Sequence, residues 1–213
     1  MNYFKKIFIV SIAIINFVGC TFHSDKKEST IKIDITFKKG DMLNPAKWQC
    51  ADIEDEKICI PHSWKIVRQD KVLFLSKWDT IDVNSYFVVL KYSMAEKELS
   101  VNKYLKETYT QFKKDTVEVL MNHKLKRLIF NNKVTYFGEY ITSIKGKEYL
   151  TSSTVFEKND YIYEIALKVD SINSNLYKEQ YKDILFNFYH KKRTIFSATD
   201  ELKDIQMVDM SKL

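Results

Sequence analysis

Alternation of apolar and polar side chains with a period of two is the main pattern in this chain, and it predicts β-strands. It is clearest over residues 161–169, where every second residue is aromatic or aliphatic. Residues 31–37 alternate in the same way, which is typical of a strand with one buried face. Runs rich in β-branched and aromatic residues predict further strands at 72–75, 86–92, 125–130, 134–144, 148–156 and, in the tail, about 205–208.

A second periodicity, with apolar residues three and four apart, predicts two helices. Ser100 can cap the first helix, which then runs to about residue 114. A Ser93-x-x-Glu96 pattern offers an earlier start, because it matches a capping box. The second helix spans about 175–189. The expected buried stripes are Val101, Tyr104, Leu105, Tyr109 and Phe112 in the first helix, and Tyr177, Tyr181, Ile184, Leu185 and Phe188 in the second.

The order of these elements indicates the fold class. Short turns at Asn131-Asn132, 145–147 and 157–160 join consecutive strands, which predicts antiparallel pairing. Residues 86–92 are almost all apolar, as expected for a strand that is covered on both faces. We therefore predict an α+β fold: an antiparallel sheet of about six or seven strands with helices packed on it, in three α/β/α layers.

The beginning of the chain has a different pattern. Two lysines precede an apolar segment, residues 7–18, which is shorter than the roughly 20 residues of a membrane-spanning helix and typical of a signal-peptide core. The run Phe17-Val18-Gly19-Cys20 that follows resembles the lipobox of bacterial lipoproteins. An ordinary secretory signal with a chance cysteine is the alternative. We expect a signal peptide at 1–19, a polar tether at 20–30, one domain at 31–192 and a C-terminal tail at 193–213.

The lipobox resemblance implies a lipid anchor. Cys20 would receive a diacylglycerol group, become the first residue of the mature chain and take up palmitate label. Two or more acyl chains hold a protein lastingly at a membrane. Thr21 is not the acidic residue that retains some lipoproteins at the inner membrane. We therefore expect a location in the cell envelope, with the outer membrane preferred and the domain periplasmic or surface-exposed.

Cys50 and Cys59 are the two remaining cysteines. An exported chain reaches an oxidising compartment, where such pairs form disulfides. The segment 48–60 reads as a hairpin with an acidic turn at 52–56, which the bond would close. Two free buried thiols are the alternative, and a redox pair is disfavoured because the spacing is not Cys-x-x-Cys.

Composition supports a folded domain rather than a disordered chain. Hydrophobic residues make up 45% of the sequence and aromatic residues 14%, which is enough for a core, and there are only 4 Gly and 2 Pro. The net charge is +6, but the basic residues are interleaved with acidic ones. This pattern indicates a solvated surface. Together with the expected location, it argues against a nucleic-acid partner.

The sequence contains no recognisable catalytic or metal-binding motif, and we predict no cofactor. Its 4 histidines, His23, His62, His123 and His190, are not spaced as metal ligands. His62 could face a cleft with Trp64, although a structural role is favoured. Glu139 and Glu164 could meet across the sheet as a hydrolase pair. Surface carboxylates are far commoner, so we favour a protein that is not an enzyme.

Five tyrosines in the second half of the chain admit two interpretations. They could line a groove for a small apolar ligand or a lipid, because tyrosine combines apolar area with a hydroxyl group. They could instead fill the core between sheet and helices, which we favour. The residues are Tyr136, Tyr140, Tyr149, Tyr161 and Tyr163.

Local phrases between residues 59 and 189, in their order, resemble the PsbP-like fold, which includes the DcrB-like envelope lipoproteins. The phrases are Ile60-Pro61-x-x-Trp64-Lys65, Ser100-Val101-x-x-Tyr104-Leu105, Tyr161-Ile162-Tyr163-Glu164-Ile165 and Tyr181-x-x-Ile184-Leu185-x-x-Phe188. The resemblance implies a non-catalytic binding or assembly module. The resulting hypothesis is an envelope lipoprotein that binds another envelope protein. The alternatives are a lipoprotein that binds a small apolar ligand or lipid and, less favoured, a hydrolase.

Overall fold

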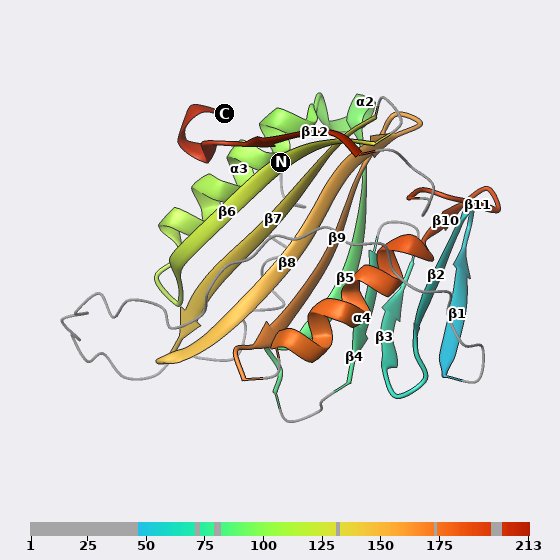
Figure 1. Ribbon diagram of the computed structural model, residues 1–213, viewed down its shortest axis with the longest axis horizontal. Helices are drawn as coiled ribbons and strands as arrows, with labels where there is room; N and C mark the ends of the chain where they lie inside the picture. Colours follow the sequence, from blue (N-terminus) through green and yellow to red (C-terminus); the bar gives the residue numbers. More distant parts are fainter. Residues whose placement is uncertain (1–46, 71–72, 79–81, 131–132, 173, 197–201) are drawn as a thin grey trace.

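The computed structural model describes residues 47–70, 73–78, 82–130, 133–172, 174–196 and 202–213 (Figure 1). The predicted signal peptide, Cys20, the tether and the predicted strand 31–37 lie outside the described residues, and so does the turn Asn131-Asn132. The alternation of apolar and polar residues that predicts the other strands is realised as two antiparallel sheets.

The larger sheet has eight strands in the order β12-β6-β7-β8-β9-β5-β4-β3, and the smaller has four in the order β1-β2-β10-β11. The strands are β1 (Trp48–Ile53), β2 (Glu56–Pro61), β3 (Lys65–Gln69), β4 (Leu73–Lys77), β5 (Tyr86–Ser93), β6 (Glu118–Phe130), β7 (Lys133–Ile144), β8 (Lys147–Lys158), β9 (Tyr161–Asp170), β10 (Tyr189–His190), β11 (Arg193–Thr194) and β12 (Leu202–Met207). The helices are α2 (Met94–Lys97), α3 (Val101–Lys114), α4 (Ser174–Phe186) and the 3-10 turn η1 (Met210–Lys212).

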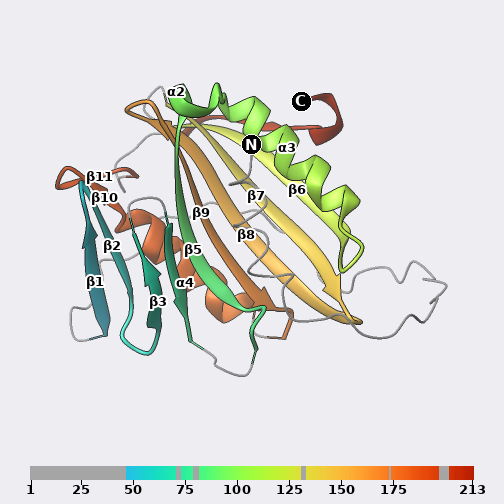
Figure 2. The same ribbon diagram turned by 180° about the vertical axis from the view of Figure 1, so that it is seen from behind.

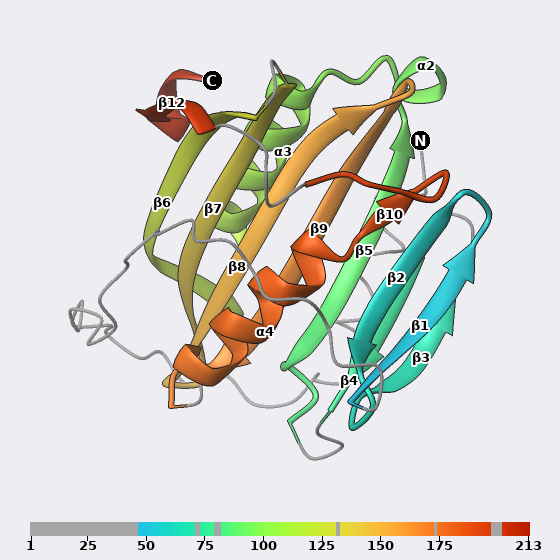
Figure 3. The same ribbon diagram turned by 45° about the vertical axis from the view of Figure 1, so that its right-hand side comes forward.

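The α+β class is confirmed, but the expected single sheet of six or seven strands is wrong. The β1–β2 hairpin does not join the large sheet. Its strand β2 pairs instead with β10, the short strand that follows α4 in the chain. The tail contributes a strand to the large sheet instead: β12 pairs with β6, close to the predicted 205–208. Figure 3 shows the small sheet in front of β3 and β4.

The two main helices cover opposite faces of the large sheet (Figures 1 and 2). Side chains alternate between the faces, so Tyr136 and Tyr140 of β7 pack in the cluster beneath α3, whereas Phe137 and Ile141 pack in the cluster beneath α4. The small sheet extends the α4 layer, since Ile58 and Ile60 belong to that second cluster. This arrangement agrees with the predicted three layers.

Helix α3 begins as the sequence predicts. The Ser100 side chain accepts a hydrogen bond from the Lys103 backbone N–H at 3.2 Å and caps the helix. The alternative start after Ser93 forms the separate short helix α2. Three residues of the expected stripe, Tyr104, Leu105 and Tyr109, are buried, and the other two are partly buried.

Helix α4 ends at Phe186 rather than near residue 189. The Asn187 backbone N–H bonds to the carbonyls of Asp183 and Ile184, and the chain then leaves the helix. Tyr189 and His190 pair with β2 as strand β10. Phe188 is buried as predicted, but its burial comes from this crossing segment and not from the helix.

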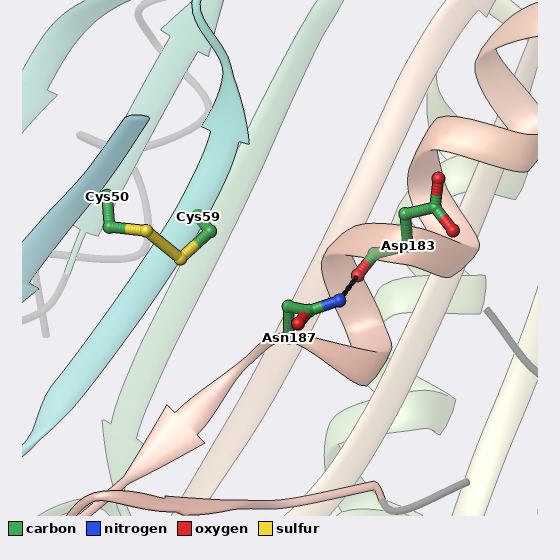
Figure 4. The surroundings of a disulfide bond; sticks show 4 residues. All are labelled: Cys50, Cys59, Asp183 and Asn187. Atoms are coloured by element: carbon green, nitrogen blue, oxygen red, sulfur yellow. Dashed lines mark hydrogen bonds between the residues drawn. A yellow bond between two sulfur atoms is a disulfide. The ribbon is translucent and has the colours of Figure 1, made fainter. Parts of the chain in front are cut away.

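Cys50 and Cys59 form a disulfide bond, as predicted. The two residues lie directly opposite each other in the β1–β2 ladder. Figure 4 shows the bond beside the last turn of α4, where Asn187 Nδ2 donates to the Asp183 carbonyl at 2.9 Å. The free-thiol alternative is therefore wrong for this pair.

We expect the double substitution Cys50→Ala/Cys59→Ala to lower the free energy of unfolding by about 2.5–3 kcal/mol, because the bond restricts a short loop in the unfolded chain. Urea unfolding of the variant and of the oxidised wild type measures the difference. Reduced wild type should unfold at the same midpoint as the variant. Equal midpoints for the variant and the oxidised protein would contradict this expectation.

Candidate functional site

A buried carboxylate lies where the small sheet meets the large one. Glu56, the first residue of β2, has only 4% of its surface exposed. Its Oε1 accepts a hydrogen bond from Tyr163 Oη at 2.5 Å and lies 3.1 Å from His190 Nδ1. Lys91 Nζ is 3.2 Å from Oε1 and 3.3 Å from Oε2. One side chain thus binds residues of β5, β9 and β10.

His190 extends this network to the β8–β9 turn. Its Nε2 lies 2.8 Å from Asn159 Nδ2, which is a donor. A neutral imidazole with its proton on Nδ1 satisfies both contacts, since Nδ1–H donates to Glu56 while Nε2 accepts from Asn159. His190 follows the helix predicted over about 175–189 and is a buried residue of β10.

The charges in the network are matched. Burial lowers the pKa of Lys91, but the hydrogen bonds and charges of Glu56 and Glu54 outweigh this effect and hold it above its ordinary value. Burial and the hydrogen bond to Glu56 raise the pKa of Tyr163 well above its ordinary value. Lys91 is therefore a cation and Tyr163 a neutral donor at physiological pH. The Glu56–Lys91 ion pair and the Tyr163 hydrogen bond support a structural anchor.

Three tight turns surround this network: Glu54-Asp55, Asn159-Asp160 and Lys191-Lys192. Five of these six residues have positive φ, between 49° and 63°. The exception is Asp55, whose carbonyl accepts a hydrogen bond from the Lys191 backbone N–H at 2.7 Å. A left-handed conformation costs roughly 1–2 kcal/mol for a residue such as lysine, so the surrounding contacts must hold these turns in place.

The six turn residues and Tyr161 are all exposed. We call them the three-turn surface. Lys91 Nζ lies 4.6 Å from the centre of the Tyr161 ring, a cation–π contact that ties the exposed tyrosine to the buried network. The surface combines an aromatic ring with acidic, basic and amide groups on a rigid base.

A second polar cluster lies beneath α3. Glu164 of β9 accepts hydrogen bonds from Tyr104 Oη of α3 and from Ser153 Oγ, the latter at 2.8 Å. Burial raises the pKa of Glu164 above its ordinary value, although both hydrogen bonds act in the opposite direction. The cluster fastens α3 to the sheet.

The suggested carboxylate pair does not form. Glu139 faces α4, where Lys178 Nζ lies 2.9 Å from its Oε1, whereas Glu164 faces α3. The strand register puts their side chains on opposite faces of the sheet. These two residues therefore cannot act together on one bond.

The histidines are also dispersed. His62 is exposed, whereas Trp64 is buried against Trp78 with ring centres 4.7 Å apart, so the two do not share a cleft. His123 packs against Tyr109. His23 lies outside the described residues. Within the described ranges, no group of three or more His, Cys, Asp or Glu residues could hold a metal ion.

The five tyrosines do not line one groove. Tyr136 and Tyr140 are buried beneath α3, and Tyr163 is buried on the α4 face. Tyr149 is buried too, with its Oη 3.3 Å from Asp82 Oδ1, and Tyr161 is exposed. The core interpretation is therefore correct for four of the five.

Glu56, Lys91 and His190 were not found as a site from the sequence. Lys91 lies 35 positions after Glu56 along the chain, and His190 lies 134 positions after it. The only local signal is an acidic residue at the start of an apolar strand, and such residues are usually exposed in a turn.

A comparison with protein families and with curated proteins finds no match for this sequence. Among solved structures, the solution structure of a PsbP protein, CyanoP, from Synechocystis sp. PCC 6803 is 13% identical. It is similar over 72% of this chain and 98% of its own, with a TM-score of 0.49.

Two crystal structures give lower scores. A Bacteroides thetaiotaomicron protein is 12% identical over 65% of this chain and 46% of its own, with a TM-score of 0.39. A Pseudomonas aeruginosa protein of unknown function is 10% identical over 63% of this chain and 94% of its own, with a TM-score of 0.40.

In the part of the chain that the structure describes, none of the helices has the length and apolar character needed to cross a membrane.

We expect Glu56→Ala to lower the free energy of unfolding by about 3–5 kcal/mol, because Lys91 and His190 then lose their buried partner. Its neighbour Asp55 is the control: it forms an exposed ion pair with Lys191 at 3.6 Å, and Asp55→Ala should cost less than about 1 kcal/mol. Urea unfolding followed by circular dichroism measures both. Equal losses in the two variants would show that the network does not anchor the small sheet.

The Glu164 cluster leads to a pH prediction. The raised pKa means that the folded state holds the proton more tightly than the unfolded state, so this group destabilises the fold as pH rises above about 4.5. Glu164→Gln, which is neutral at every pH, should be more stable than wild type at pH 7, because it buries no charge. The advantage should shrink toward pH 4. Unfolding free energies measured from pH 4 to 8 test this, and an advantage that grows on acidification would contradict it.

Proposed function

We propose that this chain is a lipid-anchored protein of the cell envelope that binds another protein through the three-turn surface and performs no catalysis. The anchor is Cys20, with the outer membrane as the preferred location. The lipobox-like run supports this proposal, and the Cys50–Cys59 disulfide suits an exported chain.

The observation that carries the proposal is that buried contacts hold the three turns in place. Lysines in left-handed conformation persist where the surrounding structure holds them, and such strained positions gather at functional sites. Here the Glu56 network and the Lys191–Asp55 hydrogen bond hold the turns. A surface that is already ordered loses little entropy on association, and tyrosine is common at the centre of interfaces.

The position of this surface also suits an anchored protein. The antiparallel hairpins place the three turns at one end of the molecule, whereas β1 begins at the other (Figure 1). A membrane that faces the start of β1 would leave the three-turn surface available to a partner.

Neither alternative gains an observation of this kind. A site for a small apolar ligand was suggested by the five tyrosines, and these are distributed over both faces of the sheet. A hydrolase was suggested by Glu139 and Glu164, which lie on opposite faces.

Photo-crosslinking in cells that express the intact lipoprotein tests the proposal. We expect the wild type to fractionate with membranes, to incorporate a palmitate analogue and to give one crosslinked partner. Cys20→Ala should lose both the label and the membrane fraction. Tyr161→Ala/Lys192→Glu should keep the anchor and lose the partner, because it changes the three-turn surface and leaves Cys20 unaltered.

Lys106→Glu is the control, since Lys106 is an exposed lysine of α3 that lies outside the three-turn surface and outside its supporting network. Continued labelling of Cys20→Ala would exclude the anchor. An equal loss of the partner in both surface variants would exclude the three-turn surface. An apolar ligand retained in native mass spectrometry would favour the ligand-binding alternative.

A further inference from the structure

The end of the molecule opposite the three-turn surface differs from it in its exposed side chains. It contains the start of β1, the 82–85 turn, the β7–β8 turn and the start of α4, along the lower side of Figure 1. We call it the entry end, because the described chain begins there at Lys47, whose carbonyl accepts a hydrogen bond from the His62 backbone N–H at 2.9 Å.

Large apolar side chains project from separate loops of the entry end. Val83 is 65% exposed, Val117 57%, Ile172 89% and Leu176 62%. Val83 precedes β5, Val117 precedes β6, and the other two flank the start of α4. We call these four residues the apolar tips. They are distributed along the ends of the strands and are not a single contiguous patch.

Hydrogen bonds fix the turns beside two of these tips, Val83 and Ile172. Asp82 accepts from the Asn84 backbone N–H at 3.0 Å and from Ser85 Oγ at 3.0 Å, which fixes the turn that carries Val83. Lys147 Nζ binds the same carboxylate at 2.8 Å. Beside Ile172, the Ser171 backbone N–H bonds to the Glu148 carbonyl at 3.0 Å. An apolar side chain on a rigid turn stays exposed until a partner covers it.

The charges around the tips are predominantly positive. The acidic side chains of this end are Asp82, Asp115, Glu118, Glu148 and Asp170. Asp82 and Asp170 lie 2.8 and 3.7 Å from Lys147, and Glu118 binds Lys168 at 2.5 Å. The exposed basic residues of the same end are Lys47, Lys65, Lys113, Lys114 and Lys145. Apolar tips among lysines are the combination that binds the headgroup region of an anionic membrane.

We propose that the entry end docks on the surface of an anionic lipid bilayer, with the apolar tips inserted at the level of the headgroups. The inference rests on the proposed lipid anchor, because the anchor is what brings the domain to a bilayer. A tether alone leaves a domain free to rotate. The tips and lysines supply contacts that hold it with the three-turn surface directed away from the membrane.

Fluorescence of the intact, lipidated protein in vesicles tests the docking. The vesicles contain phosphatidylethanolamine and phosphatidylglycerol in a 3:1 ratio, with or without bromine on the acyl chains. Bromine quenches tryptophan near the boundary of the acyl chains, about 5–10 Å deep, where an interfacial side chain lies. Ile172→Trp is the probe, and Ile205→Trp, 51% exposed on β12, is the matched control.

The wild type itself carries Trp48, Trp64 and Trp78, so its loss of emission with bromine is the baseline. We expect Ile172→Trp to lose more emission than this baseline. The emission that Ile205→Trp adds should be unchanged by bromine. Salt at 1 M, where the Debye length falls to about 3 Å, should weaken the quenching. Circular dichroism of both variants should match that of wild type.

Flotation with the vesicles reports the anchor separately from the docking. Protein that floats without extra quenching of Ile172→Trp would overturn the docking and leave the proposed function standing. Protein that does not float would instead exclude the anchor. Emission of Ile172→Trp that depends on protein concentration and not on bromine would assign the surface to a second copy of the chain and overturn the proposal.

Discussion

A carboxylate without water around it needs partners, since the desolvation of an ion costs several kcal/mol. Glu56 finds them in Lys91, Tyr163 and His190, which lie 35, 107 and 134 positions away along the chain. These contacts join β2 to the large sheet and to the segment that follows α4. This one buried group thus ties the small sheet to the large sheet beside the three turns.

Glu56 and Glu164 differ in how their charge is compensated. Glu56 lies against the ammonium group of Lys91, whereas the described hydrogen bonds to Glu164 come from the hydroxyls of Tyr104 and Ser153. Burial therefore raises the pKa of Glu164. The first acid fixes the relation between the two sheets at the three-turn surface, and the second fastens α3 to the opposite face.

Antiparallel pairing gives the molecule two distinct ends, because each hairpin turn must lie at one end or the other. The three-turn surface presents an aromatic ring and mixed charges, and the entry end presents apolar tips among lysines. This polarity suits the proposed function. One end would contact the membrane that holds Cys20, while the other would remain accessible to a protein partner.

The sequence by itself determined the features that depend on near neighbours. The alternation at 161–169 is strand β9, Ser100 caps α3, and Cys50 and Cys59 are bonded across a short hairpin. Each of these follows from local periodicity, a local hydrogen bond or a short loop, so each can be read from a few consecutive residues. The same reasoning supports the lipobox-like Cys20, which lies outside the described residues.

Only the tertiary structure decided which distant residues meet. It paired β10 with β2 and β12 with β6, separated Glu139 from Glu164 by the thickness of the sheet, and brought Glu56 to His190. The physical reason is that a buried polar group can be satisfied by any suitable partner in the chain. The choice among those partners depends on the packing of the whole domain, which no local pattern contains.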